Sequence, residues 1–318
     1  MENKQQTTFE NMQLAVIEEI NNLMEKDPEL VMINADFGLL FRSGKVPPLF
    51  PERILDVGIA EANMISIASG MAYSGRTVFT TTLAAMVEAR VTEQIKLDVC
   101  YPNLNVKILG HGRGLSFGEA GFTHIAIEDF AILRSIPNLT VLAASDAIQV
   151  QKMIRAAYEH NGPVYIAVPR GGVPLVYSDI PCDFQIGKAV TIREGNDLTI
   201  IAAGDTVAYS AEASDILSKE YGVSARVLDM ASIKPIDRNA IVKAAKETGR
   251  ILTVESHNTI GGLGGAVAEI VCEEEPVRVC RLGIPDCVPT VGMTKEVVHY
   301  YHLDSEGIVK TTLEFMKK

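Results

Sequence analysis

Short apolar runs rich in β-branched residues alternate with longer helical stretches along the first half of the chain. Strands are predicted over the apolar runs Leu30–Asn34, Ile54–Ile59, Thr77–Thr81, Asn105–Gly110, Leu139–Ala143 and Val164–Val168. Helices are predicted between them, over Glu61–Tyr73, Met86–Val99, Ala126–Ser135 and Ala147–His160. Apolar strands that alternate with helices of about ten residues or more indicate a parallel sheet covered on both faces.

The pattern breaks after Arg170. Residues 171–184 are rich in glycine and proline, which is typical of a linker. The alternation then resumes, with strands predicted over Leu198–Ala203, Ala225–Asp229, Ile251–Glu255 and Val277–Leu282 and with helices from Val207 and over Asp237–Thr248, Gly265–Val271 and Ser305–Met316. The chain is therefore expected to form two α/β domains, residues 1–175 and 188–318, joined by a linker over residues 176–187.

Composition argues against several classes of protein. The 40 Asp and Glu outweigh the 29 Lys and Arg, for a net charge of −11, which argues against nonspecific nucleic-acid binding. Every apolar run is interrupted before the roughly 18 residues that a membrane span needs. Residues 1–13 are polar and lack an apolar signal core, so a cytoplasmic protein is expected. The 5 cysteines are odd in number and hold no C-x-x-C pair, which favours free thiols in a reducing compartment over disulfides or zinc.

The first candidate for chemistry is the segment Asp56–Glu61, in which an apolar strand ends at Gly58 and Glu61 opens an apolar helix. A carboxylate there lies at the carboxyl end of a strand, where open α/β sheets bind ligands. The absence of charge along the following helix indicates burial, and a carboxylate at the edge of a buried helix can share a proton with a ring nitrogen. The alternative is a helix-start acid that stabilises the helix dipole.

A second candidate is the glycine-rich segment from Gly110 to His124, which follows a strand and precedes a helix. Its glycines permit close backbone approach, and the His and Arg side chains among them favour an anionic or hydroxylated ligand. The segment matches neither the dinucleotide nor the phosphate-loop motif, and a flexible surface loop is the alternative. Arg170, which ends a strand, could bind phosphate or face solvent. Gly261–Gly265 opens a later helix, where tight packing and anion binding both stay open.

Together these segments resemble the C-terminal half of the transketolase family, a pyrimidine-binding domain followed by the transketolase C-terminal domain. The resemblance covers residues 8–318 and is carried by the segments Asp56–Glu61, Tyr101–Ile108, Gly118–His124 and Glu255–Gly265. It implies two three-layer α/β domains and the cofactor thiamine diphosphate. Family enzymes bind the diphosphate through a first domain with a Gly-Asp-Gly motif, and the sequence holds no such motif.

The resemblance therefore implies the second subunit of a split transketolase that is active only with a partner. A partner chain of the N-terminal type would bring the diphosphate site and a divalent metal, Mg or Ca. The family's dimeric habit implies a heterotetramer with two copies of each chain. The implied substrates are sugar phosphates, with a two-carbon ketol unit passing from a ketose to an aldose.

Family roles carry over onto individual positions of this sequence. Glu61 matches the catalytic glutamate that hydrogen-bonds the aminopyrimidine ring, and Asp36 matches an aspartate that lines the cofactor pocket. His124 matches the histidine that contacts sugar hydroxyls near the reacting carbonyl. Arg170 matches the arginine that grips the substrate phosphate.

Departures from the family pattern bear on the substrate. Leu83 and Met86 stand where phenylalanines usually stack on the pyrimidine, so the cofactor pocket stays apolar but loses aromatic contacts of about 0.5–1.5 kcal/mol. Ala120 stands where an aspartate usually reads a donor hydroxyl, which implies a branched or substituted donor. The loop histidine falls one place early, at His111. An arginine usual near residues 11–13 is absent, and Arg113 is expected to take over anion binding.

Two other functions stay open at this point. A β-type subunit of a 2-oxoacid dehydrogenase shares the two-domain layout, although Gly121–His124 and Tyr101–Ile108 favour a transketolase. A non-catalytic interaction subunit is the third candidate, because of the changes at positions 83, 86 and 120. An assay of ketol transfer against lipoamide reduction separates the first two, and Glu61→Ala tests the third.

Overall fold

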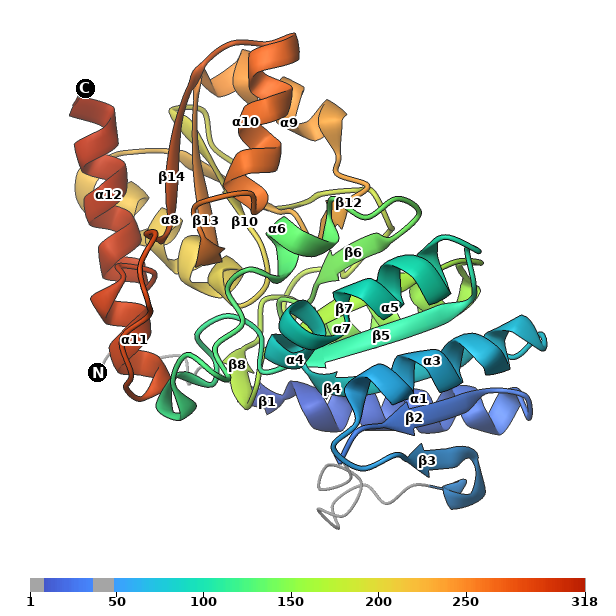
Figure 1. Ribbon diagram of the computed structural model, residues 1–318. Coiled ribbons are helices and arrows are strands. Elements are labelled where there is room, and N and C mark those ends of the chain that lie inside the picture. The colour runs from blue at the N-terminus through green and yellow to red at the C-terminus, as the bar shows by residue number, and fades with distance from the viewer. Residues whose placement is uncertain (1–8, 37–48, 318) are drawn as a thin grey trace.

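The computed structural model describes residues 9–36 and 49–317, which form two α/β units, one above the other in Figure 1. The first unit is built on a seven-stranded sheet in the order β12-β6-β7-β5-β4-β2-β3. Its strands are β2 (Val31–Asn34), β3 (Ile54–Asp56), β4 (Val78–Leu83), β5 (Val106–His111), β6 (Thr140–Ala143), β7 (Val164–Val168) and β12 (Ser232–Lys234). Neighbouring strands pair in parallel except β12, which runs antiparallel to β6.

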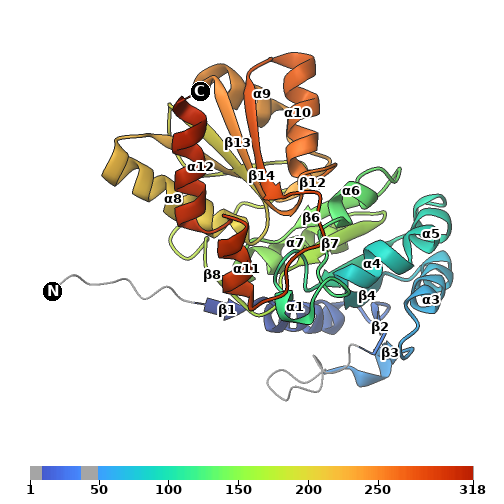
Figure 2. The same cartoon turned by 60° about the vertical axis from the view of Figure 1, so that its left-hand side comes forward.

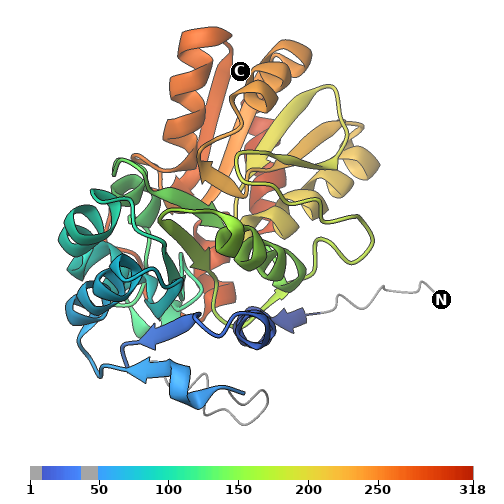
Figure 3. The same ribbon diagram turned by 90° about the vertical axis from the view of Figure 1, so that its right-hand side faces the viewer.

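Helices cover both faces of this sheet because its central strands are apolar on both sides. On one face α1 (Met12–Lys26) packs along α7 (Ala147–Glu159). The other face carries α3 (Glu61–Tyr73), α4 (Ala84–Arg90), α5 (Thr92–Gln94), the π-helical segment η2 (Ile95–Cys100) and α6 (Asp129–Leu133). Figure 3 shows α1 almost end-on, beneath the sheet. A short 3₁₀ turn, η1 (Pro51–Arg53), leads into β3.

The second unit repeats this plan around a five-stranded sheet in the order β14-β13-β10-β11-β9. Its strands are β9 (Val190–Arg193), β10 (Leu198–Ala202), β11 (Ala225–Asp229), β13 (Arg250–Asn258) and β14 (Arg278–Ile284), with only β9 antiparallel to its neighbour. Helices α8 (Thr206–Tyr221) and α12 (Ser305–Lys317) pack together on one face, and α9 (Arg238–Thr248) and α10 (Leu263–Glu274) on the other. The predicted pair of three-layer α/β domains is confirmed.

The two units share a boundary with both apolar and backbone contacts. One apolar core runs across it and includes Ile33 of β2 as well as Ile201 of β10. Strand β12 belongs to the second half of the sequence yet completes the first sheet by pairing with β6. Helix α11 (Thr294–Tyr300) lies away from the second sheet, beside the loop that follows β5 (Figure 2). The second half of the sequence therefore adds an edge strand to the first sheet and packs against the loop that follows β5.

The largest difference from the predicted elements is α1, a regular helix of 15 residues that was not predicted, and α11 was not predicted either. The other differences lie in short or irregular segments. The helix predicted over residues 86–99 is divided into α4, α5 and η2, and the helix predicted over residues 126–135 shortens to α6. The edge strands β9 and β12, and the two-stranded sheet of β1 (Phe9–Asn11) and β8 (Gly172–Pro174), have 3 or 4 residues each, too few for a periodicity. Within residues 9–36 and 49–317, no helix is both long and apolar enough to cross a membrane.

Candidate functional site

The carboxyl ends of the parallel strands meet at one edge of the first sheet, and predicted site residues lie along that edge. In sheet order they are Arg170 after β7, His111 at the end of β5, Leu83 at the end of β4, Asp36 after β2 and Glu61 after β3. Parallel pairing places these positions side by side although they are far apart in the sequence. Open α/β sheets bind ligands at this edge.

Glu61 occupies the first turn of α3 and is buried, with 6% of its surface exposed. Gly58, at a φ of 71°, makes the tight turn that leads to it. Asp56 Oδ1 accepts the backbone N–H of Gly58 at 2.9 Å and that of Asp36 at 3.1 Å. The Asp56 carboxylate therefore ties the end of β3, which leads to Glu61, to the end of β2, where the exposed Asp36 lies.

An ion pair holds α4 against α3 at this point. Glu61 Oε2 lies 3.0 Å from Nη1 of Arg90, whose side chain is 54% exposed. Met86 lies one helical turn before Arg90, on the same side of α4, and Leu83 ends β4 just before α4 begins. Both Leu83 and Met86 are half-buried. A buried carboxylate beside accessible apolar side chains fits a flat ring that needs one hydrogen bond and an apolar face, as the aminopyrimidine of thiamine diphosphate does.

The glycine-rich loop after β5 gathers two predicted substrate residues around one aromatic ring. The His124 ring meets Phe117 edge-on, with centroids 5.3 Å apart, and Arg170 Cζ lies 3.9 Å from the Phe117 centroid. At Gly112, whose φ is 73°, the loop passes close to Leu83, one of the predicted cofactor-binding residues. A Cβ there would lie 3.5 Å from Phe117 and 3.7 Å from Leu83.

Both of these predicted substrate residues also have polar partners within the chain. His124 Nδ1 lies 2.9 Å from Thr123 Oγ1, and Arg170 Nη1 donates to Glu119 Oε1 at 2.7 Å. Glu119 belongs to the 3₁₀ turn η3 (Gly118–Ala120). A cavity of about 430 Å³ opens beside Arg170. Arg170 therefore remains accessible to a ligand from this side.

Two predictions for the loop need correction. The Arg113 side chain is fully buried, with Nε 3.7 Å from Asp129 Oδ2 and Nη1 3.6 Å from Asp205 Oδ1. It pairs with an acid from each unit and is closed to an anionic substrate. His111 is 1% exposed, and burial lowers the pKa of its ring to about 3. The ring is therefore neutral and enclosed by the chain, so its predicted contact with substrate does not fit this structure either.

Two buried acids, Glu88 of α4 and Asp129 of α6, lie on helices that contact each other. Glu88 Oε2 accepts the backbone N–H of Glu128 at 3.1 Å, and Tyr165 donates its hydroxyl to Asp129 Oδ2 at 2.9 Å. Burial raises the pKa of Glu88 to about 10, with a further contribution from the Asp129 carboxylate. Glu88 is therefore protonated at neutral pH, which lets α4 pack against the acidic segment that precedes α6 without charge repulsion.

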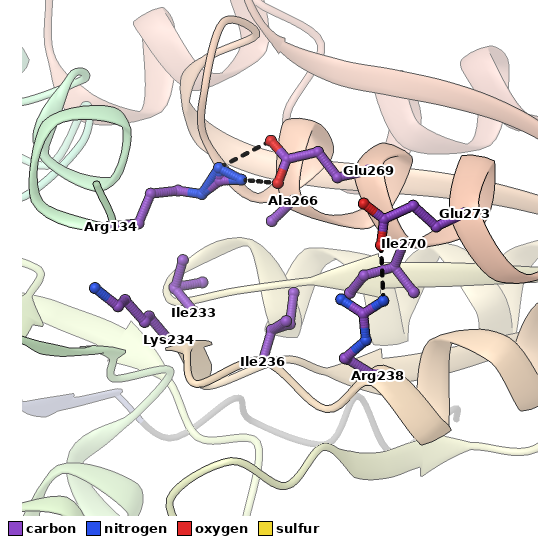
Figure 4. Close-up of a pocket in the computed structure, with 9 residues that line it drawn as sticks. All are labelled: Arg134, Ile233, Lys234, Ile236, Arg238, Ala266, Glu269, Ile270 and Glu273. Carbon is purple, nitrogen blue, oxygen red and sulfur yellow. Dashed lines mark hydrogen bonds and ion pairs between the residues drawn. The ribbon is translucent and has the colours of Figure 1, made fainter. Parts of the chain in front are cut away.

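A second hollow, of about 300 Å³, lies between the units and is drawn in Figure 4. Arg134 makes a two-pronged pair with Glu269 of α10, at 3.1 and 2.5 Å. Arg238 donates to Glu273 at 2.8 Å. The predicted site residues do not line this hollow, and these four charges are paired with each other. We therefore assign it to the contact between the units.

The described part of the chain holds no group of three or more His, Cys, Asp or Glu side chains that could bind a metal ion.

Sequence reasoning missed Arg90 and Phe117. For Arg90 a signal existed, because it follows Met86 by four residues in a predicted helix and so shares its face. For Phe117 the signal was absent, since Arg170 is far from it in the sequence and only the parallel pairing of β5 with β7 brings the two together.

Comparison with known proteins identifies the class of protein to which this edge belongs. Residues 10–175 match the transketolase pyrimidine-binding domain, and residues 187–308 match the transketolase C-terminal domain. The chain is 43% identical over 296 residues to an apulose-4-phosphate transketolase subunit of Phocaeicola vulgatus, covering 93% of this chain and 94% of the relative. It is 37% identical over 295 residues to the 6-deoxy-6-sulfo-D-fructose transketolase subunit SqwH of a Clostridium species, covering 92% and 91%.

A solved structure agrees with these relatives. A split-gene transketolase, described as an inactive β4 tetramer, superposes with a TM-score of 0.88 at 37% identity, covering 96% of this chain and 98% of that chain. The protein belongs to the transketolase family, whose enzymes use thiamine diphosphate. The resemblance to the C-terminal subunit of a split transketolase is thereby confirmed.

Proposed function

We propose that this chain supplies the pyrimidine-binding half of a thiamine-diphosphate-dependent transketolase that moves a two-carbon ketol unit from a ketose to an aldose. The observation that carries the proposal is the buried Glu61 at the carboxyl ends of the strands, beside the half-buried Leu83 and Met86. Spacing alone left Glu61 as either a helix-start acid or an acid–base group. Its burial at the sheet edge, where Leu83 and Met86 are only half-buried, favours the second.

Each residue at the edge then has a task. Glu61 would hold a proton against a nitrogen of the cofactor ring, while Leu83 and Met86 pack on the ring and Asp36 lines the pocket. When bound, the cofactor supplies the carbon nucleophile that attacks the ketose carbonyl. His124 would hydrogen-bond the hydroxyl groups next to that carbonyl.

The substrate's anionic group would be held by Arg170. The half-exposed Ala120 has only a methyl side chain, which leaves room beside the loop. Relatives are named for apulose 4-phosphate and for 6-deoxy-6-sulfo-D-fructose. We propose a branched or substituted ketose that carries a phosphate or sulfonate as the donor.

We further propose that activity requires a partner chain of the N-terminal type, which holds the diphosphate and its Mg or Ca ion. The surface formed by α3 and the neighbouring η2 supports this. Ile59 is 74% exposed, Tyr73, at the other end of α3, is 80% exposed, and Tyr101, which follows η2, is 86% exposed. Large exposed apolar side chains on neighbouring elements favour a protein contact. Two copies of each chain would form a heterotetramer, and the free cysteines of the chain suit the cytoplasm.

The test is reconstitution. Co-expression with an N-terminal-type transketolase subunit, followed by a panel of phosphorylated, branched and sulfonated ketoses, should give ketol transfer that depends on added thiamine diphosphate. Glu61→Gln and Glu61→Ala should each lower kcat roughly 10²–10⁴-fold, without changing the thermal midpoint by more than a few degrees.

A matched control is Glu306→Gln, which removes a first-turn acid from α12, remote from the sheet edge. It should leave kcat unchanged. Full activity of Glu61→Ala would overturn the assignment of the site, and lipoamide-linked oxidation of 2-oxoacids in place of ketol transfer would overturn the reaction.

A further inference from the structure

The cavity beside Arg170 is shared by both units of the fold. Its volume is about 430 Å³. The first unit contributes residues from the start of α1, from the loop after β5 and from the segment after β7. The second unit contributes Asp205 and Tyr209 near the start of α8, and Thr294, Lys295 and Val298 of α11. A ligand held by Arg170 would therefore also meet the C-terminal domain.

The positive charge of Arg170 is partly compensated within the chain. Its guanidinium donates to Glu119 at 2.7 Å and lies 3.9 Å from the Phe117 ring centroid, with 41% of the side chain exposed. A tetrahedral anion that carries two charges is poorly balanced by one arginine that already shares its charge with a carboxylate. A singly charged sulfonate would share Arg170 with Glu119 in the same way, so a second cation at this cavity would strengthen the binding of either anion.

Lys295 is the other cation that lines this cavity. It is exposed on the first turn of α11, and it forms no salt bridge with any residue that the structure describes. The neighbouring Glu296 instead accepts the backbone N–H of Met293 at 3.0 Å, which occupies one of its oxygens in the helix cap. The ammonium group of Lys295 is thus available to a ligand.

Helix α11 is fixed to the loop that carries the substrate residues. Thr294 Oγ1 donates to the backbone oxygen of Ser116 at 3.4 Å, and the Gly292 N–H reaches the Gly118 oxygen at 3.4 Å. A Cβ at Gly118 would lie 2.8 Å from the Gly292 oxygen, so the two segments are in direct contact. The position of Lys295 is therefore set relative to Arg170 through a short run of contacts.

We propose that Lys295 is the second cation of the subsite that receives the phosphate or sulfonate of the sugar substrate. The C-terminal domain then takes a direct part in substrate recognition. This inference rests on the proposed function, because it takes the cavity beside Arg170 as the place where the anionic end of the sugar binds.

The first test needs no catalysis. The full chain is titrated with inorganic phosphate and, separately, with sulfate, by NMR or calorimetry. Lys295→Gln and Arg170→Gln should each weaken binding about 5- to 20-fold, the range between an exposed ion pair and a charge-assisted hydrogen bond. Lys310→Gln, an exposed lysine on α12, is the matched control and should bind as the wild type does. Binding unaffected by Lys295→Gln overturns the inference.

The second test uses the reconstituted enzyme. Lys295→Gln should raise KM for phosphorylated and sulfonated ketoses by the same about 5- to 20-fold, with kcat and the KM of an uncharged ketose unchanged. Lys295→Arg should restore most of the loss. An effect of Arg170→Gln without one of Lys295→Gln overturns this inference and leaves the proposed function standing. An absence of ketol transfer from every donor overturns the proposed function, and the phosphate titration then decides the role of Lys295.

Discussion

The buried guanidinium of Arg113 allows a prediction whose size follows from its surroundings. Arg113 has no exposed surface, lies 3.7 Å from Asp129 in the first unit and 3.6 Å from Asp205 in the second, and places Cζ 4.0 Å from the centre of the Phe130 ring. One cation thus compensates two buried acids from different units. Arg113→Met keeps the apolar stem, removes the charge and leaves both carboxyl groups without it.

Removing one partner of a buried ion pair costs about 3–5 kcal/mol, because the remaining charge stays in a medium of low polarity. For 318 residues, an unfolding entropy of about 2.1 cal/mol/K per residue gives roughly 0.7 kcal/mol/K in total. The thermal midpoint of Arg113→Met should therefore fall by about 4–7 °C.

The deficit should also depend on pH, with a sign that the geometry sets. Burial raises the pKa of Asp205 to about 6, against the opposing pull of Arg113. Loss of Arg113 raises that pKa further. When a carboxyl group has a higher pKa in the folded than in the unfolded state, the folded protein loses stability as pH rises from about 4 through the folded-state pKa. The deficit of Arg113→Met should therefore be larger at pH 8 than at pH 5.

The assay is heat denaturation of the full chain, followed by circular dichroism at both pH values. Adding Asp205→Asn to Arg113→Met removes one of the stranded charges and should recover part of the loss at pH 8. Arg134→Gln breaks the more exposed pair with Glu269 between the same units and should cost less than about 1 kcal/mol. A midpoint for Arg113→Met within about 1 °C of the wild type, or a larger deficit at pH 5, would refute the reasoning.

The remaining predictions concern other charged side chains. Arg90→Gln removes the half-exposed partner of Glu61. The Kd of the reconstituted enzyme for thiamine diphosphate should change by less than about 5-fold. A larger change would make Arg90 part of the cofactor site. Burial raises the pKa of Glu88 to about 10, so Glu88→Gln should unfold like the wild type in urea at pH 7. Glu88→Ala leaves the Glu128 N–H without its acceptor and should lower the free energy of unfolding by about 1–3 kcal/mol. Equal losses in both variants would contradict a protonated Glu88. Burial raises the pKa of Asp229 to about 7, so its ionisation costs stability as pH rises from about 4 to 7. The thermal midpoint of Asp229→Asn should exceed that of the wild type by more at pH 8 than at pH 5. A gain in midpoint at pH 5 alone would contradict the raised pKa of Asp229.

Much of the fold could be predicted because most of its information is local. The strands β7 and β11 and the helix α3 begin and end at the residues that the apolar pattern predicts. The edge strand β12 was beyond reach, because it is stabilised by pairing with β6 and has no periodicity of its own. The division of one predicted helix into α4, α5 and η2 also has no counterpart in the pattern.

For the candidate site, residue type and position were readable but surroundings were not. Glu61, Leu83, Met86 and Arg170 were named from the sequence, and the structure places them on one edge of the sheet. Arg113 was misjudged because a cation among glycines has the same signature in a ligand loop and in a buried pair. Only the packing of the second unit, which brings Asp205 to within 3.6 Å, separates the two.

The sequence by itself therefore determined the two α/β units and the acid at the start of α3, since strand and helix periodicities and chain order are properties of neighbouring residues. The tertiary structure alone decided which side chains share an environment. Parallel pairing aligned strand ends from across the first half of the chain, and the docking of the second unit enclosed Arg113 while leaving Arg170 and Lys295 on one cavity. Burial and charge compensation depend on atoms distant in sequence, so they arise only when the units pack together.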